Sequence, residues 1–273
     1  MIPTLIAKAR KIVFKFGSNT LADRDGKINP VFLGEFAEQA AALIGGGKQI
    51  VVVSSGAQAA GLSTMEKWAR KRDLHYRQAL CAVGQVELMD AWRRAFEKHG
   101  LHIAQILLTR DDFGDRIRTL NMRNTLFTLV DEGIIPIVNE NDTVSVEEIK
   151  IGENDTLAAQ SAILWSADLL ILFSDVDGLY DKNPKEHPGA ELIDEVRDIG
   201  EVRNRVSMGN VSSFGTGGIA TKIDAAERAL SYGIPTIIAH GGRPRCLEAL
   251  AAGTQRGTAF TGQDGQDRPS SGS

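Results

Sequence analysis

Short apolar runs alternate along this chain with longer segments whose apolar residues recur at helical spacing. The runs are four to six residues long and rich in Val and Ile, which is typical of buried strands, and the segments between them are long enough for crossover helices. This alternation predicts an α/β fold in which a mostly parallel sheet is sandwiched between helices. The strands are expected at residues 12–16, 50–53, 103–108, 134–138, 169–173 and 236–239.

Three of the intervening segments carry helix signals. Asn29 supplies an N-cap and Pro30 a first-turn proline for a helix that we expect to end at Gly45. A second helix is expected after the strand at 50–53, and a third before Gly133. The apolar faces assigned to these two are Tyr76, Ala79, Val83, Val86 and Met89 in the second, and Met122, Leu126, Leu129 and Val130 in the third.

Composition narrows the class of ligand. The chain has 273 residues, of which 42% are hydrophobic and 24% charged, as in ordinary globular proteins of one or two domains. Its formal net charge is −4, and Lys and Arg form no long block. We therefore expect neither a nucleic-acid partner nor a membrane surface, and a small molecule is the better candidate ligand.

The two ends predict location and domain limits. The first residues lack the apolar run of a signal peptide, and no apolar stretch approaches the ~20 residues that span a bilayer, so we expect a cytoplasmic protein. Residues 1–260 are expected to form one domain. Residues 261–273 are polar and rich in Gly, Ser and Asp, which predicts a disordered tail.

Cysteine and histidine offer little metal chemistry. Cys81 and Cys246 lie far apart in helical contexts, so we interpret them as small core residues rather than a disulfide or a CxxC motif. The five histidines lack the spacing of a zinc site. No metal-ligating residues are assigned.

The carboxyl ends of the predicted strands are where ligands bind in such sheets. The first strand carries Lys15 and runs into Gly17 and Ser18, a small-residue turn that can direct backbone N–H groups at phosphate oxygens. The second strand ends in Ser54 and Ser55, and Gly56 after them lets the backbone approach a ligand closely.

A glycine-rich loop at 215–218 leads into a helix that contains Lys222 in its first turns, an arrangement suited to anions. The same glycines match a dinucleotide fingerprint, but the strand before them and the acid about 20 residues later are missing. The sequence around Lys48 does not match a Walker A loop either, because the motif requires Ser or Thr after the lysine and this chain has Gln49. We expect a phosphate site of another kind.

Asp142, Asn154 and Asp155 each allow two interpretations. Asp142 and Asn154 are suited to an amino group and a carboxylate, and Asp155 to orienting lysines; yet Asn and Asp also form turns and cap helices, and Asp155 precedes an apolar helical segment. Ser174 and Asp175 end the fifth strand, where we expect a nucleotide.

Eight blocks in order carry a family resemblance between residues 12 and 260. Together they resemble the glutamate 5-kinase branch of the amino acid kinase family. Many members have Gly-Thr-Ser where this chain has Gly17, Ser18 and Asn19, and many append a PUA domain that this chain does not show. The blocks are KFGSNTL, VVVSSGAQAAG, CAVGQ, LLTRDD, PIVNENDTV, IKIGENDT, SDVDGLYDKNP and GTGGIATK.

The resemblance implies a reaction and a set of site residues. ATP and Mg²⁺ would serve to phosphorylate L-glutamate for proline synthesis, with coupling to glutamate-5-semialdehyde dehydrogenase and assembly into a homo-oligomer. Lys15 and Lys222 would contact the transferring phosphoryl group, with Asp155 organising both lysines. The implied glutamate ligands are Ser55, Asp142 and Asn154, and the implied ATP ligands are Ser174, Asp175, Thr216, Gly217, Gly218, Ile219, Ala220, Thr221 and Lys222.

Two alternatives remain at this point. A sister kinase would act on aspartate, N-acetylglutamate or a carbamate, although such relatives tend to carry paired glycines after the first-strand lysine, where this chain has Gly17 and Ser18. A non-catalytic amino-acid sensor on the same fold would need neither Lys15 nor Lys222, and both are present.

Overall fold

The computed structural model describes residues 1–23, 25–65, 73–144, 153–182, 184, 186–207 and 218–262, with backbone alone at 153 and 204–207. The chain divides into two compact units. The terminal unit comprises Met1–Lys15 and Ile151–Ser273, and the middle unit comprises Phe16–Lys150.

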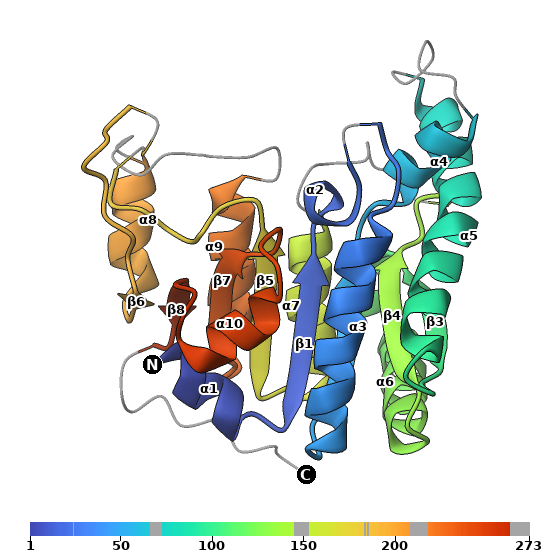
Figure 1. Cartoon of the computed structure of the whole chain (residues 1–273), viewed down its shortest axis with the longest axis horizontal. Coiled ribbons are helices and arrows are strands. Elements are labelled where there is room, and N and C mark those ends of the chain that lie inside the picture. The colour runs from blue at the N-terminus through green and yellow to red at the C-terminus, as the bar shows by residue number, and fades with distance from the viewer. Residues whose placement is uncertain are drawn as a thin grey trace. The chain divides into compact units, whose positions relative to one another are not determined.

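In the middle unit, three parallel strands lie in the order β3-β4-β2. Val52 of β2 lies opposite Ile137 of β4, and Ile103 of β3 lies opposite Ile135. Figure 1 shows α3, α5 and α6 running alongside these strands. The elements are α2 (Ser18–Leu21), α3 (Pro30–Gly45), β2 (Gln49–Ser54), α4 (Ala57–Met65), α5 (Leu74–Glu97), β3 (Ile103–Leu108), the 3₁₀ turn η1 (Arg110–Phe113), α6 (Arg116–Asp131) and β4 (Ile135–Glu140).

In the terminal unit, five strands lie in the order β1-β5-β7-β8-β6. β5 pairs with β7 and β6 with β8 in parallel, whereas β7 and β8 are antiparallel. In Figure 1, α1 lies next to α10. The elements are α1 (Ile2–Lys8), β1 (Lys11–Phe16), α7 (Glu153–Trp165), β5 (Leu169–Ser174), β6 (Glu195–Val196), α8 (Ile199–Ser207), α9 (Ile219–Leu230), β7 (Thr236–His240), α10 (Cys246–Ala252) and β8 (Thr258–Phe260); the last residue of β1 belongs to the middle unit.

The predicted fold class is confirmed: the strands are mostly parallel and helices flank them. All six predicted strands are present. The two that the sequence did not reveal, β6 and β8, span two and three residues, too few for a periodic pattern. No helix in the described part of the chain combines the length and the apolarity that crossing a bilayer requires.

The first predicted helix is also confirmed. α3 begins at Pro30, and the side chain of Asn29 accepts hydrogen bonds from the backbone nitrogens of Val31 and Phe32 at 3.2 and 3.1 Å. The helix ends at Gly45, as the sequence predicted. An N-cap side chain and a glycine stop thus fix both ends of this crossover.

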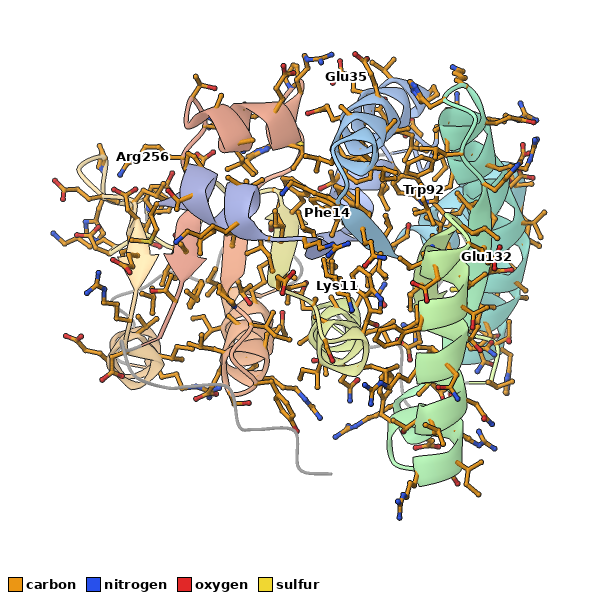
Figure 2. The ribbon with its side chains drawn as sticks, turned by 90° about the horizontal axis from the view of Figure 1, so that it is seen from below. Lys11, Phe14, Glu35, Trp92, Glu132 and Arg256 are labelled. Atoms are coloured by element: carbon orange, nitrogen blue, oxygen red, sulfur yellow. The ribbon has the colours of Figure 1, made fainter. Side chains whose placement is uncertain are left out.

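A cluster of aromatic rings holds α3 and α5 against the strands of the middle unit. The rings of Phe16 and Phe36 meet edge to face at 4.6 Å between centroids, and Phe36 meets Trp92 in the same way at 5.9 Å. Trp92 Nε1 donates to Ser54 Oγ at 3.0 Å, so this buried ring also satisfies its polar atom. Figure 2 shows Trp92 between α3 and α5.

The predicted apolar face of α5 is correct only in part, although the helix itself is present: Tyr76, Val83 and Met89 are half-buried. Leu80, Gly84 and Leu88 lie on the buried side, whereas Val86 is 69% exposed and Ala79 is also exposed. The reason is the contact with α4, which needs a residue without a side chain. A hydrophobicity pattern does not count glycine as a core residue. In α6 the predicted face is only partly buried: Leu126 is buried, and Met122, Leu129 and Val130 are half-buried.

Two glycines bring α4 and α5 into close approach. A Cβ at Gly84 would lie 1.8 Å from the carbonyl oxygen of Ala57 and 2.3 Å from the backbone nitrogen of Gly61. A Cβ at Gly61 would lie 2.0 Å from the carbonyl oxygen of Leu80. Because these neighbours are backbone atoms, neither position accepts alanine without moving a helix.

We therefore expect Gly84→Ala to lower the free energy of unfolding by about 3 kcal/mol or more, since overpacking forces backbone shifts. Gly34→Ala in α3 is the matched control, because a Cβ there meets nothing within 4 Å. It should raise stability by roughly 0.5–1 kcal/mol through helix propensity. Urea unfolding of both variants measures the difference; equal stabilities would show that the two helices separate easily.

Candidate functional site

A buried group of charged side chains lies at the carboxyl end of β1 in the terminal unit. Lys15 Nζ lies 2.5 Å from Asp155 Oδ1, and Lys222 Nζ lies 3.2 Å from Asp155 Oδ2. The exposed fractions are 5% for Lys15, 4% for Lys222 and 0% for Asp155. We call these three residues the cationic centre, because two ammonium groups share one carboxylate and leave a net charge of +1.

Three elements position the cationic centre. β1 carries Lys15 and is fixed at its start by Asp168, whose Oδ2 accepts hydrogen bonds from the backbone nitrogens of Arg10 and Lys11 at 2.9 Å each. α7 carries Asp155 in its first turn, and α9 carries Lys222. Residues far apart in sequence therefore meet at one strand end.

Thr221 ties the start of α9 to the carboxylate. Its Oγ1 lies 2.9 Å from Asp155 Oδ2 and 2.8 Å from the carbonyl oxygen of Gly218, the N-cap residue of α9. The carboxylate thus receives a hydroxyl as well as the two ammonium groups. Sequence reasoning placed Thr221 only among ATP ligands and did not foresee this contact with Asp155.

The alternative interpretation of Asp155 as a helix cap is not what the structure shows. α7 begins at Glu153, so Asp155 lies inside the first turn. The carboxylate interacts with the side chains of Lys15, Lys222 and Thr221 instead. Its role is to organise lysines, as the sequence allowed.

Burial and charge act against each other on these groups. Burial lowers the pKa of Lys15, and the nearby charge of Lys222 adds to this effect, while Asp155 and the charge of Asp175 oppose it. Burial would raise the pKa of Asp155, but the charges of Lys15 and Lys222 outweigh it and hold that pKa below its usual range. Asp155 is therefore ionised at neutral pH, and the two ammonium groups beside it suit an anionic ligand.

The predicted nucleotide edge lies in the same unit. Ser174 ends β5, its Oγ lies 3.1 Å from Asp175 Oδ1, and its carbonyl oxygen accepts from the backbone nitrogen of Gly241 at 2.8 Å. At the start of α9, Gly218 is half-buried, the side chain of Ile219 is buried in the core and Ala220 is exposed. Ile219 can therefore offer a ligand only its backbone. Thr216 and Gly217 lie outside the described residues, as does the predicted tail beyond residue 262.

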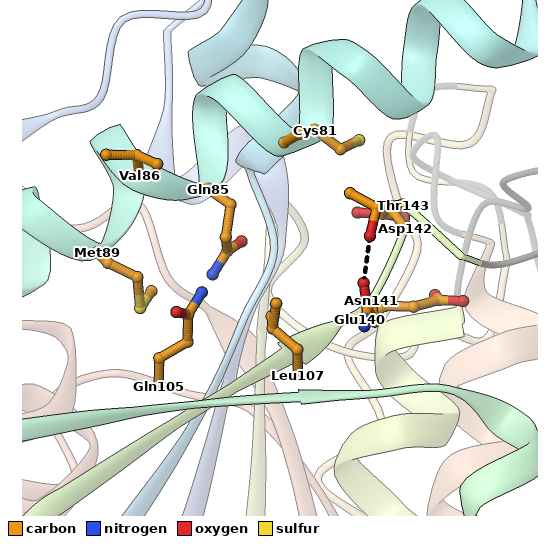
Figure 3. A pocket seen from close by; sticks show the side chains of 11 residues that line it. Cys81, Gln85, Val86, Met89, Gln105, Leu107, Glu140, Asn141, Asp142 and Thr143 are labelled. Carbon is orange, nitrogen blue, oxygen red and sulfur yellow. Dashed lines mark hydrogen bonds between the residues drawn. The ribbon is translucent and has the colours of Figure 1, made fainter.

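The middle unit contains a cavity of about 420 Å³ between α5, β3 and the segment that follows β4. Figure 3 shows its side chains, with Glu140 and Asp142 at one end and Met89 toward the other. Val86 and Met89 line this cavity, which explains why part of the apolar face predicted for α5 is not packed in the core. Two carboxylates at one end suit a cationic group such as an ammonium.

Cys81 lies beside Asp142 in this cavity. Burial raises the pKa of the Cys81 thiol strongly, and the charge of Asp142 and a hydrogen bond to its carboxylate raise the pKa further. The thiol therefore stays protonated and donates to Asp142. The interpretation of Cys81 and Cys246 as buried is confirmed, at 3% and 2% exposed, but sequence reasoning missed the place of Cys81 beside Asp142. The signal available was its position in the block CAVGQ.

The remaining predicted ligands are Ser55 and Asn154. Ser55 follows β2, and its backbone nitrogen donates to the carbonyl oxygen of Phe16 at 3.1 Å. The register of Val53 with Val138 puts Ser55 at the same strand edge of the middle unit as Asp142. Asn154 is half-buried in the first turn of α7, in the terminal unit. The turn predicted after Lys15 is a short helix, α2, with Gly17 as its N-cap.

No cluster of three His, Cys, Asp or Glu side chains suited to a metal ion occurs among the described residues. Magnesium usually keeps several waters and binds through one or two carboxylates together with substrate phosphates. The residues present, with Asp175 near the cationic centre, fit a magnesium ion that enters with a nucleotide.

Comparison with known proteins gives consistent matches. Residues 10–240 match the model of the Amino acid kinase family. A glutamate 5-kinase of Alkaliphilus metalliredigens is 61% identical over 260 residues, which cover 95% of this chain and 98% of that protein. The glutamate 5-kinase of Treponema pallidum (strain Nichols) is 43% identical, over 95% of this chain and 99% of that protein.

Other relatives are longer or more distant. A glutamate 5-kinase of Geobacter sulfurreducens is 44% identical, over 94% of this chain but 69% of that protein. Among solved structures, the UMP kinase from Bacillus anthracis aligns with a TM-score of 0.62 at 15% identity, over 93% of this chain and 96% of that one. At this identity the likeness shows the fold alone.

The contact between Cys81 and Asp142 makes a prediction about thiol reactivity. With Cys246→Ala, Cys81 is the sole cysteine of the chain. Asp142→Asn removes a charge that raises the pKa of Cys81, so we expect iodoacetamide at pH 8 to alkylate the thiol about fivefold faster or more.

Amide hydrogen exchange in α5 separates this effect from simple access. Better access requires that the helix opens more often, which speeds the exchange of its amides, whereas a lowered pKa alone leaves that exchange unchanged. Both proteins should react alike in urea. An unchanged alkylation rate in the folded Asp142→Asn protein would show that the carboxylate does not act on the thiol.

Proposed function

The chain belongs to the amino acid kinase family, and we propose that it transfers the γ-phosphoryl group of ATP to the side-chain carboxylate of L-glutamate, giving L-glutamyl 5-phosphate. The observation that carries this proposal is the cationic centre, where Lys15 and Lys222 share the single carboxylate of Asp155. Relatives up to 61% identical that bear the name glutamate 5-kinase support the choice of substrate.

The chemistry requires charge cancellation rather than a base. A glutamate side chain has an ordinary pKa of about 4.3, so the nucleophile is already an anion at neutral pH. Bringing that anion to the γ-phosphate opposes like charges, and phosphoryl transfer is catalysed mainly by positioning and electrostatic stabilisation. Lys15 and Lys222 supply two positive charges, and Asp155 keeps their ammonium groups in place.

The nucleotide is held by the terminal unit. Backbone N–H groups at the start of α9 suit phosphate oxygens, and α9 presents that end at Gly218. By resemblance, Thr216 and Gly217 complete this loop, and Ser174 and Asp175 bind the rest of ATP. When bound with ATP, Mg²⁺ neutralises part of the phosphate charge.

Glutamate is recognised by both its α-groups and its length. Asp142 pairs with the α-ammonium in the acidic end of the cavity, while Ser55 and Asn154 bind carboxylate oxygens. N-acetylation would remove the ammonium and leave the carboxylate of Asp142 without its charged partner. Aspartate keeps the ammonium but is one methylene shorter, which holds its nucleophile roughly 1 Å short of the phosphorus.

The wider setting is part of the same proposal. The product is a reactive acyl phosphate, so a reductase such as glutamate-5-semialdehyde dehydrogenase is the partner that consumes it in proline synthesis. We place the reaction in the cytoplasm and expect a homo-oligomer. Residues 1–260 are proposed to act as one kinase domain.

The substrate assignment is tested by trapping the acyl phosphate. With ATP, Mg²⁺ and hydroxylamine, the protein should form γ-glutamyl hydroxamate from L-glutamate and at least about tenfold less product from aspartate or N-acetylglutamate, measured as kcat/KM. A higher kcat/KM with either of those acids would exclude glutamate as the preferred substrate. The protein would then still be a kinase that acts on a carboxylate. No product from any acid would favour the sensor.

The role of the lysines is tested separately. Lys15→Ala and Lys222→Ala should each lower kcat by on the order of 10²–10³, the scale for losing one preorganised charge-stabilising group. The control is Lys8→Ala at the exposed end of α1 in the same unit, which should leave kcat unchanged. Thermal midpoints show whether each variant folds. A folded variant with near-normal kcat at saturating ATP would exclude that lysine from the mechanism.

A further inference from the structure

A buried pair of amide side chains joins α5 to the end of β4 in the middle unit. Asn139 Nδ2 donates to Gln85 Oε1 at 2.8 Å, and the exposed fractions are 2% for Asn139 and 8% for Gln85. Asn139 Oδ1 in turn accepts a hydrogen bond from the backbone nitrogen of Glu140 at 2.9 Å. A chain of two hydrogen bonds therefore runs from the helix to the backbone at which β4 ends.

The backbone that this chain of hydrogen bonds reaches is the one that carries Asp142. The next residue, Asn141, donates through its backbone nitrogen to the carbonyl oxygen of Leu108 at 2.8 Å. Its side-chain Oδ1 accepts from Thr143 Oγ1 at 2.6 Å, the bond drawn in Figure 3. Asp142 lies between these two anchored residues, so its position follows from the position of residues 139–141.

A second contact joins the same helix to the same segment. Cys81 precedes Gln85 by one helical turn on α5, and its thiol donates to the carboxylate of Asp142. Two successive turns of one helix face thus reach residues 139 and 142: Gln85 through Asn139, and Cys81 through Asp142 directly. This is how a rigid helix can fix a carboxylate that sits on a loop.

We propose that Gln85 and Asn139 are positioning residues for the glutamate site, which set the place of Asp142 through their hydrogen bonds, and that Gln85 does so while it also lines the cavity. The inference rests on the proposed function. The pair is poorly explained by stability, because a buried polar pair gains little over apolar residues of the same size. In addition, Gln85 Nε2 is buried and has no hydrogen-bond partner among the described residues. Amide side chains form hydrogen bonds with a defined direction, which apolar side chains of the same size cannot do.

The test separates positioning from stability. Gln85→Leu and Asn139→Leu each leave one buried amide without its partner, and the double variant removes both. Each single variant should raise the KM for glutamate about tenfold, the scale for a misplacement of under 1 Å, with the KM for ATP within twofold of wild type. In the double variant, the stability in urea should recover while the KM for glutamate stays raised.

A matched control removes packing from the same helix without disturbing the amide pair. Leu88→Ala opens a cavity on the buried face of α5 and should lower stability at least as much as either single variant, yet leave the KM for glutamate within twofold of wild type. If Gln85→Leu fails to fold, Gln85→Met replaces it in the same measurements, because methionine keeps the length of the side chain.

A readout independent of activity comes from the thiol. In the Cys246→Ala background, Gln85→Leu should speed the alkylation of Cys81 at pH 8 by more than Leu88→Ala does, because only the first displaces Asp142 from the thiol. A double variant with wild-type KM for glutamate, or an alkylation rate no faster than that of Leu88→Ala, would overturn the inference. A wild-type protein that forms no γ-glutamyl hydroxamate would instead overturn the proposed function, while the alkylation rate still tests the pair.

Discussion

The carboxylate of Asp155, shared by the ammonium groups of Lys15 and Lys222, is the constraint on which the terminal unit depends. Two lysines and one buried carboxylate need a further negative charge close by, and Asp175 and an anionic ligand are the groups that can supply it. That requirement explains why β1, α7 and α9 must end or begin at one place, and why Asp168 and Thr221 fix the ends of these elements so closely.

The middle unit has the opposite electrostatic character. Its cavity ends in the carboxylates of Glu140 and Asp142, and Cys81 beside Asp142 is kept as a thiol. A cationic group is favoured there for the same reason that an anion is favoured at the cationic centre. An unmodified amino acid offers this cavity an ammonium group, whereas an N-acylated acid does not.

Sequence reasoning predicted what periodicity and capping determine. The six long strands and both ends of α3 follow from local patterns, and Lys15 and Lys222 stood out because they lie at a strand end and a helix start. Their pairing with Asp155 came from the family resemblance, since no spacing rule joins residues so far apart. The buried face of α5 was predicted correctly only in part, because a glycine contact sets it. The contacts of Cys81 and Gln85 were not predicted at all, because a buried thiol and a buried amide look like ordinary core positions until a tertiary partner is known.

The glycine contact and the amide pair are linked through the geometry of α5. Gly84 and Gln85 are adjacent, and a helix turns about 100° between adjacent residues, so one points to α4 while the next points to β4. The close approach at Gly84 fixes the rotation of α5 about its axis, because no other rotation places a residue without a side chain against the backbone of Ala57. Once that rotation is fixed, Gln85 and Cys81 can only face the segment that carries Asp142. Packing between α4 and α5 therefore decides where the carboxylate of Asp142 lies. A substitution on the side of α5 that faces α4 would act on the candidate substrate site by rotating α5 about its axis, without contacting the site itself.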